Sequence, residues 1–393
     1  MKVSVVIGAN YGDEGKGRVV DWLAHRDALV IRFNGGAQAG HTVIAPDGYR
    51  HVFHHFGSGT FARAPTFLSR FFILNPILFR QEQAELSPYW PKVYVDPYAP
   101  VTTPYDMLLN QDIEKMRNTK RHGSCGVGIN ETVVRNREPE FQIRAWNLAN
   151  QDELKRSLKL IREVYVPARA EALGIKMNDV YKSEPLLKRF LEDCRKMCLT
   201  VTETSLTEAI KDARVEHLIF EGAQGLRLDE DAPGFPHVTR SKTGLTNVRK
   251  ILDEWKVRSQ QGETPEVYYV TRPYLTRHGA GPLNGELSEK PSPLIEDKTN
   301  IPHEFQGSLR FAFLNLEDFS NTVNQDQKGL KIRTNLFISC TDHVQGEWSW
   351  WDGGELRHGY WEEMAEKMAD DIGANAVLYS VGPTEEDTKS LGV

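Results

Sequence analysis

The feature that most constrains the fold of this chain is its N-terminal run, in which an apolar segment leads directly into a glycine-rich turn. Residues 3–7 are apolar except for Ser4 and mostly β-branched, which predicts a buried strand. Residues 8–17 contain four glycines and a lysine, and apolar positions from Val19 onward indicate a helix. A strand, a glycine-rich turn and a helix in this order direct backbone N–H groups and the positive helix end toward phosphate. The opening therefore predicts a phosphate-binding loop.

This turn differs from the usual P-loop. In that motif a Ser or Thr hydroxyl follows the lysine and binds Mg²⁺, whereas here Gly17 follows Lys16. The acidic pair Asp13-Glu14 lies inside the turn instead. Phosphate would repel a carboxylate in this position unless the carboxylate binds a metal ion or transfers a proton. A plain glycine-rich turn with solvated charges is the alternative, and the acidic pair together with the lysine favours chemistry.

The composition excludes several classes of function. The 393 residues carry a formal net charge of −6, so no basic field indicates nucleic acid as a partner. No apolar run approaches the ~20 residues of a membrane span, and the N-terminus enters a strand at once, unlike a signal peptide. The four cysteines lack the pairing of a zinc site. We expect a cytoplasmic α/β protein that binds neither nucleic acid nor membrane.

Polar motifs follow several further predicted strands. A second glycine-rich turn at 34–42 carries His41 among small residues, where a histidine cannot fill a core. The strand at 217–220 ends in Glu-Gly-Ala-Gln-Gly, and open α/β sheets bind ligands at the carboxyl ends of their strands. The glycines and serine of 121–130, with arginines nearby, form a third plausible anion loop.

The second half of the chain is less specific. The strand at 336–340 delivers Asp342, which could accept hydrogen bonds from a guanine edge or equally cap a helix. Residues 152–199 are charged and helical in pattern and predict scaffold or interface. An amphipathic pattern predicts a long helix from Gly354 to Ile372.

Several of these motifs occur in the order found in adenylosuccinate synthetase, and the chain resembles that family over nearly its whole length. The loop at 11–17 and Phe-Glu-Gly-Ala-Gln-Gly at 220–225 are the most specific in combination. The resemblance implies an α/β fold with a large mixed, mainly parallel central sheet flanked by helices, the P-loop-related fold of GTP-dependent ligases. It implies a single domain over 1–393 with a helical insertion around 150–200 and a mobile substrate loop around 289–310. The other matching motifs are Gly40-His41-Thr42, Ser58-Gly59, Val238-Thr239, Arg277 with Gly279-Ala280-Gly281-Pro282, and Ser380-Val381-Gly382-Pro383.

The resemblance also implies a reaction. GTP would phosphorylate O6 of IMP, and the amino group of aspartate would displace the phosphate, giving adenylosuccinate, GDP and phosphate. Asp13 would be the general base at purine N1, His41 the general acid, and Gln224 the amide near O6. Lys16 and the glycine loop would stabilise the transferred phosphoryl group. Mg²⁺ would be held by Asp13 and the carbonyl of Gly40.

The remaining site residues follow by the same resemblance. A homodimer is implied, in which an arginine crosses between subunits, and Arg135 and Arg137 are the candidates here. The residues expected to bind GTP are Gly12, Glu14, Gly15, Lys16, Gly17, Asp342, Ser380, Gly382 and Pro383. Those expected to bind the purine monophosphate or the amino acid are Gln38, Ser124, Arg135, Thr239, Arg277, Gln306 and Arg310.

The sequence departs from the family in ways that leave the substrates open. The loop that binds the aspartate carboxylates is rich in Thr and Arg in the family, whereas only Arg310 can serve within residues 300–311. Gln38 replaces the usual Asn, and Cys340-Thr341 replaces the usual Lys before the guanine-binding aspartate. These changes suggest a divergent branch, such as the viral one that acts on dGMP, although that branch typically replaces the base aspartate. A different amino-acid substrate and a GTP-binding regulator without catalysis also stay open, and the intact set of acid and base argues against the regulator.

Overall fold

The computed structural model describes residues 1–393 except 46, 90, 119–121, 260–263, 297–306 and 393. A ten-stranded sheet forms its centre, in the order β16-β15-β12-β9-β1-β8-β2-β5-β6-β7. Each of these neighbours pairs in parallel except β15 with β16, which are antiparallel. The predicted mixed, mainly parallel sheet is confirmed. Its strands are β1 (Lys2–Gly8), β2 (Ala28–Arg32), β5 (Thr66–Leu68), β6 (Val93–Val95), β7 (Val201–Glu203), β8 (His217–Gly225), β9 (Glu266–Thr271), β12 (Arg333–Ile338), β15 (Ala376–Ser380) and β16 (Thr388–Leu391).

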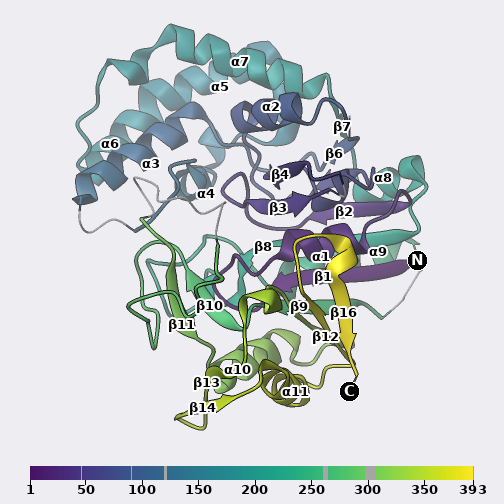
Figure 1. The fold of residues 1–393 in the computed structure, drawn as a ribbon. Helices are drawn as coiled ribbons and strands as arrows, with labels where there is room; N and C mark the ends of the chain where they lie inside the picture. Colours follow the sequence, from purple (N-terminus) through teal and green to yellow (C-terminus); the bar gives the residue numbers. More distant parts are fainter. Residues whose placement is uncertain (46, 90, 119–121, 260–263, 297–306, 393) are drawn as a thin grey trace.

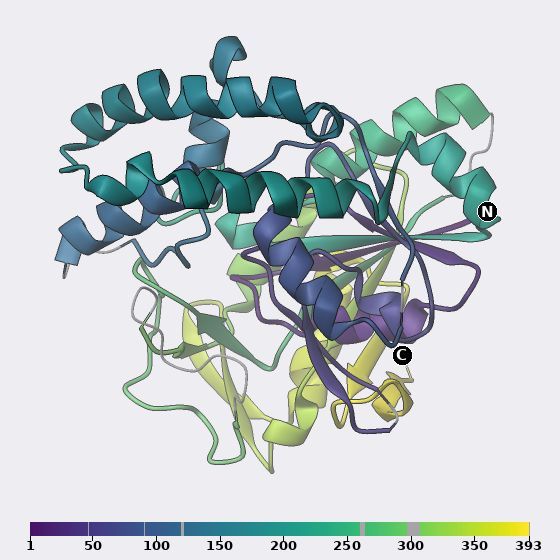
Figure 2. The ribbon, with the colours of Figure 1, turned by 90° about the horizontal axis from the view of Figure 1, so that it is seen from above.

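Helices cover the sheet, as predicted (Figure 1). Strand β1 is buried on both faces: Val5 packs in one apolar cluster, whereas Val6 packs with Val19 of α1 in another. A third apolar cluster joins the helices between α2 and α7, which Figure 2 shows gathered on one side of the molecule. The helices are α1 (Lys16–Leu23), α2 (Pro76–Glu85), α3 (Pro104–Arg117), α4 (Ile129–Arg135), α5 (Gln151–Leu160), α6 (Val166–Leu173), α7 (Glu184–Cys198), α8 (Leu206–Ala213), α9 (Leu245–Ser259), α10 (Leu316–Gln327) and α11 (Trp361–Ile372).

Three two-stranded hairpins complete the fold: β3 (His41–Ile44) with β4 (Arg50–Phe53), β10 (Tyr274–Arg277) with β11 (Arg310–Phe313), and β13 (Trp348–Asp352) with β14 (Glu355–Gly359). The last hairpin corrects the long helix expected from Gly354 to Ile372, because β14 occupies its first part and α11 begins only at Trp361. Pairing with β13 supplies the hydrogen bonds of this segment, and the two glycines at positive φ that join the strands, Gly353 and Gly354, are a local hairpin signal that the amphipathic pattern hid. Within the described residues, no helix has the length and apolar character to cross a membrane.

Candidate active site

Most of the predicted site residues lie in loops at one edge of the sheet. Strands β1, β2, β8, β9 and β12 are parallel, so their carboxyl ends meet there, and the loops that follow them carry the polar motifs. In Figure 1 these loops lie between α3 and α4 on one side and the β10–β11 hairpin on the other. The glycine-rich turn after β1 stands at the centre of this edge, because β1 is a central strand.

The two acids of this turn face in different directions. Glu14 is 2 % exposed and accepts hydrogen bonds from the backbone of Asn10 (3.0 Å) and Gly12 (2.8 Å) and from Lys16 Nζ (2.8 Å). A Cβ on Gly8 would stand 2.3 Å from Glu14 Oε2, which explains the glycine there. The Glu14 side chain therefore holds the turn together and aligns Lys16 at the start of α1. The expected contact of residue 14 with GTP stays a prediction, and it falls to the backbone because the side chain is occupied inside the turn.

Asp13, in contrast, sits at the tip of the turn with φ 61° and a partly exposed side chain. Its Oδ2 lies 3.5 Å from Nε2 of His278, in the loop that follows β10. Aspartate is one of the few non-glycine residues that tolerate this left-handed conformation. The turn thus presents one carboxylate outward, as a proton-transfer or metal-binding role requires.

His41 is anchored by a buried carboxylate. Its Nδ1 lies 2.5 Å from Glu221 Oε1, and Glu221 also accepts hydrogen bonds from Ser58 N (3.0 Å) and Oγ (2.5 Å). Arg32, which is completely buried, places Nη1 3.7 Å from the same carboxylate. A carboxylate at Nδ1 directs the other ring nitrogen, Nε2, toward the reacting group.

The charges of this cluster follow from burial and from Arg32. Burial, helped by Arg32, lowers the pKa of His41 to about 4 even though Glu221 acts in the opposite sense. Burial raises the pKa of Glu221, but Arg32 and His41 outweigh it and bring that pKa to about 2. Without ligand, His41 is therefore neutral at pH 7 and Glu221 is ionised. An anionic ligand beside His41 would raise its pKa and favour the imidazolium.

Two side-chain amides lie without partners beside this cluster. A Cβ on Gly35 would stand 3.3 Å from Gln224 Oε1 and 3.5 Å from Gln38 Nε2, so the glycine leaves room for both amides. Gln38 Oε1 and Nε2 and Gln224 Oε1 are buried and have no hydrogen-bond partner among the described residues. Buried polar atoms of this kind are typical of a site that a ligand completes. The structure therefore brings the two predicted glutamines together.

Three loops converge beside the turn after β1. The rings of His122 and His237 are 5.3 Å apart, a Cβ on Gly123 would stand 2.6 Å from Gly279 Cα, and Arg277 donates to the carbonyl of His237 at 2.9 Å. The Arg277 guanidinium also lies 4.5 Å from the centre of the Tyr11 ring. These contacts place the segments of three predicted substrate residues next to one another: Ser124, Thr239 and Arg277.

Arg135 does not belong to this site. It is completely buried and donates to Asp106 Oδ1 and Oδ2 and to the carbonyls of Val101 and Phe141. Because its donors are occupied inside the chain, Arg135 cannot reach a substrate or a second subunit. The expectation that it binds substrate is wrong, and the neighbouring Arg137 is the exposed one.

We expect Arg135→Met to lower the free energy of unfolding by about 3–5 kcal/mol, because it leaves Asp106 buried without its partner. Urea denaturation measures the loss. Arg137→Ala is the matched control and should leave stability within about 0.5 kcal/mol of the wild type. Equal stability of the two variants would contradict the structural role of Arg135.

Arg310 is engaged as well. It pairs across the hairpin with Arg277, donates to the carbonyls of Gly279 (3.0 Å) and Gly281 (2.9 Å), and forms an ion pair with Glu286. Its guanidinium thus holds the loop that follows β10, and an incoming carboxylate would have to replace Glu286. Gln306, the other residue expected in this region, lies outside the described residues.

The residues expected to bind the guanine base of GTP lie in a second group of loops. Asp342 is exposed in the turn after β12, where Cys340 N donates to Ser380 Oγ (3.2 Å) and Thr341 Oγ1 donates to Ser380 O (2.9 Å). Gly382 and Pro383 continue the loop after Ser380. Ser339 Oγ donates to the carbonyl of Glu14 at 2.7 Å, so this group is tied to the turn after β1. A nucleotide can therefore extend from the glycine turn to Asp342.

Helix α1 carries a buried acid close to this second group. Burial, helped by Glu385, raises the pKa of Asp21 to about 7. Since folding raises this pKa above the ordinary value of about 3.9, the ionised carboxylate destabilises the fold increasingly as the pH rises from about 4 to 7. We expect Asp21→Asn to stabilise the protein at pH 8 by about 2 kcal/mol and hardly at pH 4. Urea unfolding at both pH values tests this, with exposed Asp27→Asn as the control; a gain independent of pH would contradict it.

Few protein groups here could hold a metal ion. Over the described ranges, no three His, Cys, Asp or Glu side chains form a group that could hold one. The outward carboxylate of Asp13 and the exposed Gly40, next to His41, remain available. Mg²⁺ commonly takes only one or two protein carboxylates and completes its shell with water and substrate phosphates. The donor set therefore fits Mg²⁺ that arrives with a nucleotide.

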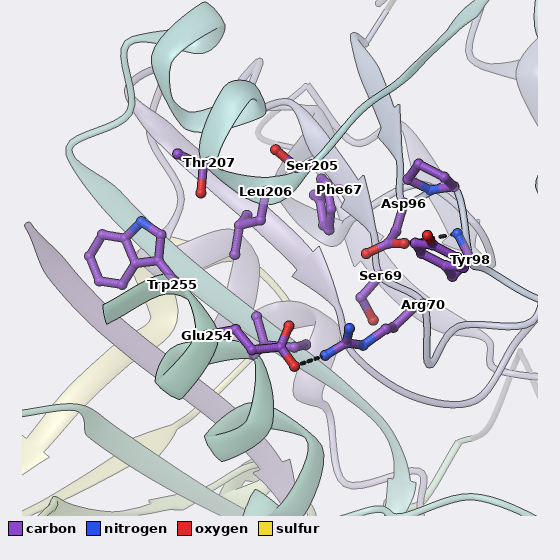
Figure 3. A pocket seen from close by; sticks show the side chains of 12 residues that line it. Phe67, Ser69, Arg70, Asp96, Tyr98, Ser205, Leu206, Thr207, Glu254 and Trp255 are labelled. Carbon is purple, nitrogen blue, oxygen red and sulfur yellow. Dashed lines mark hydrogen bonds and ion pairs between the residues drawn. The ribbon is translucent and has the colours of Figure 1, made fainter. Parts of the chain in front are cut away.

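A separate pocket lies farther along the same edge, at the ends of β5 and β6 (Figure 3). Arg70 at its mouth pairs with Glu254, and Asp96 accepts a hydrogen bond from the backbone of Tyr98. None of the residues that line it belongs to the loops described above.

The sequence analysis missed three residues of the site: Arg32, Glu221 and His278. Glu221 stood inside a motif already singled out, and an acid at the end of a buried strand was the available signal. Arg32 had no signal, because a charged residue at the end of a strand usually faces solvent. His278 followed Arg277 in a recognised motif but could not be connected to Asp13, which is far away in sequence.

A glycine-rich phosphate loop, an acid and a base, and unpaired amides at the carboxyl edge of a mainly parallel sheet define a nucleotide-dependent enzyme of P-loop-related fold. Residues 5–308 match the family model described as adenylosuccinate synthetase. The chain belongs to the adenylosuccinate synthetase family, whose members are GTP-dependent C–N ligases.

Individual relatives agree with this assignment. The chain is 29% identical over 309 residues to the enzyme of Acidithiobacillus ferrooxidans (75% of this chain, 67% of the relative) and 30% identical over 307 residues to that of Hamiltonella defensa (75% and 66%). It thus spans about two thirds of their length.

Two solved structures share the fold. Fully ligated adenylosuccinate synthetase from Plasmodium falciparum superimposes with a TM-score of 0.78 at 18% identity, covering 100% of both chains. Succinoaminodeoxyadenylate synthetase of cyanophage S-2L, bound to dGMP and dATP, gives a TM-score of 0.63 at 14% identity, covering 100% of this chain and 96% of that one.

Proposed function

We propose that this chain is a GTP- and Mg²⁺-dependent ligase that joins the amino group of aspartate to C6 of a 6-oxopurine nucleoside monophosphate such as IMP, giving adenylosuccinate, GDP and phosphate. The observation that carries the proposal is the outward carboxylate of Asp13 in the glycine-rich turn, at the same edge of the sheet as Glu221-anchored His41 and the buried, unpartnered amide atoms of Gln38 and Gln224.

Each of these groups has a task in the reaction. Asp13 takes the N1 proton of the purine, so that negative charge develops on O6, and O6 attacks the γ-phosphorus of GTP. Gln224 orients the base near O6, and Lys16 with the backbone N–H groups of the turn stabilises the moving phosphoryl group. His41, protonated on Nε2 once phosphates are bound, donates toward the phosphoryl oxygens. The amine then displaces phosphate from C6.

Mg²⁺ would neutralise charge on the GTP phosphates, and Asp13 and the Gly40 carbonyl are the groups that would hold it. The convergence of the loops bearing Ser124 and Thr239 supports a 5′-phosphate site there, and Asp342 is proposed to recognise guanine of GTP. Arg277 and Arg310, which pair across β10 and β11, are the arginines proposed to bind the amino-acid carboxylates. Arg310 can do so only when its ion pair with Glu286 opens.

A second candidate substrate is dGMP. The cyanophage enzyme of similar fold is bound to dGMP, which favours this substrate, whereas Asp13 is retained here and favours IMP. The amino-acid substrate could also be one other than aspartate, and the ion pair of Arg310 with Glu286 supports this alternative.

The test is a mass-spectrometric screen of purine monophosphates against all amino acids with GTP and Mg²⁺, combined with phosphate release. The proposal predicts phosphate release only when nucleotide, GTP and amino acid are all present, together with a succinylated purine product. Phosphate release without dependence on an amino acid would overturn it, and GTP binding without any product would instead support the regulator.

We also propose that the enzyme is a cytoplasmic homodimer, with exposed Arg137 in place of Arg135 as the arginine that crosses between subunits. Light scattering at assay concentration measures the mass. A fully active monomer would contradict the dimer.

A further inference from the structure

His278 is a histidine that the reaction described above does not use. It is the first residue after β10, in the loop whose Gly279 contacts Gly123. Both of its ring nitrogens are buried and lack a hydrogen-bond partner among the described residues. It forms an ion pair with Asp13, with 3.5 Å between Nε2 and Oδ2. A partly buried ring beside the proposed base, with its nitrogens otherwise unpartnered, is a group that a ligand can satisfy.

The two ring nitrogens of His278 face different surroundings, because Nε2 lies 3.5 Å from Asp13 Oδ2 and Nδ1 has no partner among the described residues. A neutral imidazole has one N–H donor and one acceptor. With the N–H on Nε2, the nitrogen that faces the carboxylate, Nδ1 is the acceptor. The unsatisfied group of His278 is therefore a hydrogen-bond acceptor that needs a donor from the ligand.

The position of that donor follows from the proposed function, on which this step rests. Along the edge of a 6-oxopurine the groups are O6, N1 and the C2 substituent. In the proposed function Gln224, whose side chain lies beside Gly35, orients the base near O6. Asp13 takes the proton from N1. His278 approaches Asp13 from another loop, the one that contacts Gly123 near the proposed 5′-phosphate site. The next purine group beyond N1 on that side is the C2 substituent.

Hypoxanthine and guanine differ at this point. Hypoxanthine has only C2–H, which is not a donor for a strong hydrogen bond, whereas guanine has a 2-amino group. We propose that His278 is a specificity-determining residue that accepts a hydrogen bond from the 2-amino group of the substrate, and thereby admits guanine monophosphates to the site in addition to IMP. An acceptor at this point matters for guanine because its 2-amino group would otherwise lose its hydrogen bonds to water without replacement.

The experiment measures kcat/KM for four nucleotides, IMP, dIMP, GMP and dGMP, with GTP, Mg²⁺ and aspartate. The variants are His278→Ala and His278→Phe, of which the second keeps an aromatic ring without nitrogens. His358→Ala, in exposed strand β14, is the matched control. Thermal melting of each variant verifies the fold, and His278→Phe keeps the test valid if the smaller side chain destabilises the loop.

We expect both His278 variants to lower kcat/KM about tenfold for GMP and dGMP and less than about twofold for IMP and dIMP, with the control unchanged. An equal loss of kcat/KM for all four nucleotides would overturn the inference. A loss that depends on whether the sugar is ribose or deoxyribose, and not on the base, would overturn it as well. A wild-type enzyme that uses IMP but no guanine nucleotide would also overturn it while leaving the proposed function intact. Absence of product from all four nucleotides, in contrast, would overturn the proposed function itself.

Discussion

Asp13→Asn should lower kcat about 10³-fold while leaving the fold and the binding of the purine monophosphate nearly unchanged. The amide cannot take the purine N1 proton, so O6 remains a poor nucleophile. Asparagine tolerates the left-handed φ of 61° as well as aspartate does, so the turn should keep its shape. Single-turnover phosphate release measures the chemical step, and KM for the monophosphate reports binding separately.

Glu14→Gln is the matched control for this variant, because it changes the neighbouring acid that faces inward. It weakens the hydrogen bonds to Asn10 N, Gly12 N and Lys16, and we expect it to lower the melting temperature, whereas Asp13→Asn should not. An Asp13→Asn enzyme with activity within a few-fold of the wild type would refute Asp13 as the base.

Glu221→Gln should have the second largest effect, a loss of about 10²-fold in kcat with a smaller change in KM. Glutamine has nearly the same shape but cannot stabilise a charged His41, so the pKa of His41 in the nucleotide complex should fall and less imidazolium form at neutral pH. The pH–rate profile of kcat measures this directly, and its limb assigned to His41 should move to lower pH.

A double-mutant cycle separates this effect from simple damage to the fold. In a His41→Asn background, Glu221→Gln should cost little further activity, because the two residues act as one unit. Glu221→Gln also leaves Arg32 buried without a counter-charge, so a fall in stability of a few kcal/mol is expected and is to be measured alongside. Independent, additive losses of activity would show that Glu221 does not act through His41.

Much of the site could be predicted because its chemistry is local in sequence. Four glycines and a lysine identify the turn after β1, and Gly40-His41 and the motif at the end of β8 each span only a few residues. Their positions at the ends of strands were enough to assign them to one edge, since parallel strands end together.

Two other predictions failed, one because the hairpin turn at Gly353-Gly354 was overlooked and one because of contacts between residues far apart in sequence. Gly354 to Ile372 has an amphipathic pattern, but pairing with β13 converts its first part into a strand. Arg135 looked free to bind a substrate, yet Asp106 and two carbonyls occupy it. The single-domain division and the mobile loop expected at 289–310 stay predictions, because part of that loop lies outside the described residues.

The amino-acid sequence by itself determined the class of fold and the phosphate loop, because each depends on residue types at short spacing, whereas the roles of Asp13 and His41 as base and acid come from the family resemblance and stay predictions. Only the tertiary structure decided that Glu14 faces inward and Asp13 outward, that Glu221 and Arg32 anchor His41, and that His278 meets Asp13. These distinctions depend on which side chains the fold brings together at the sheet edge and on how far burial removes each of them from water. Burial and charge partners of that kind are properties of the folded chain and are absent from any local run of residues.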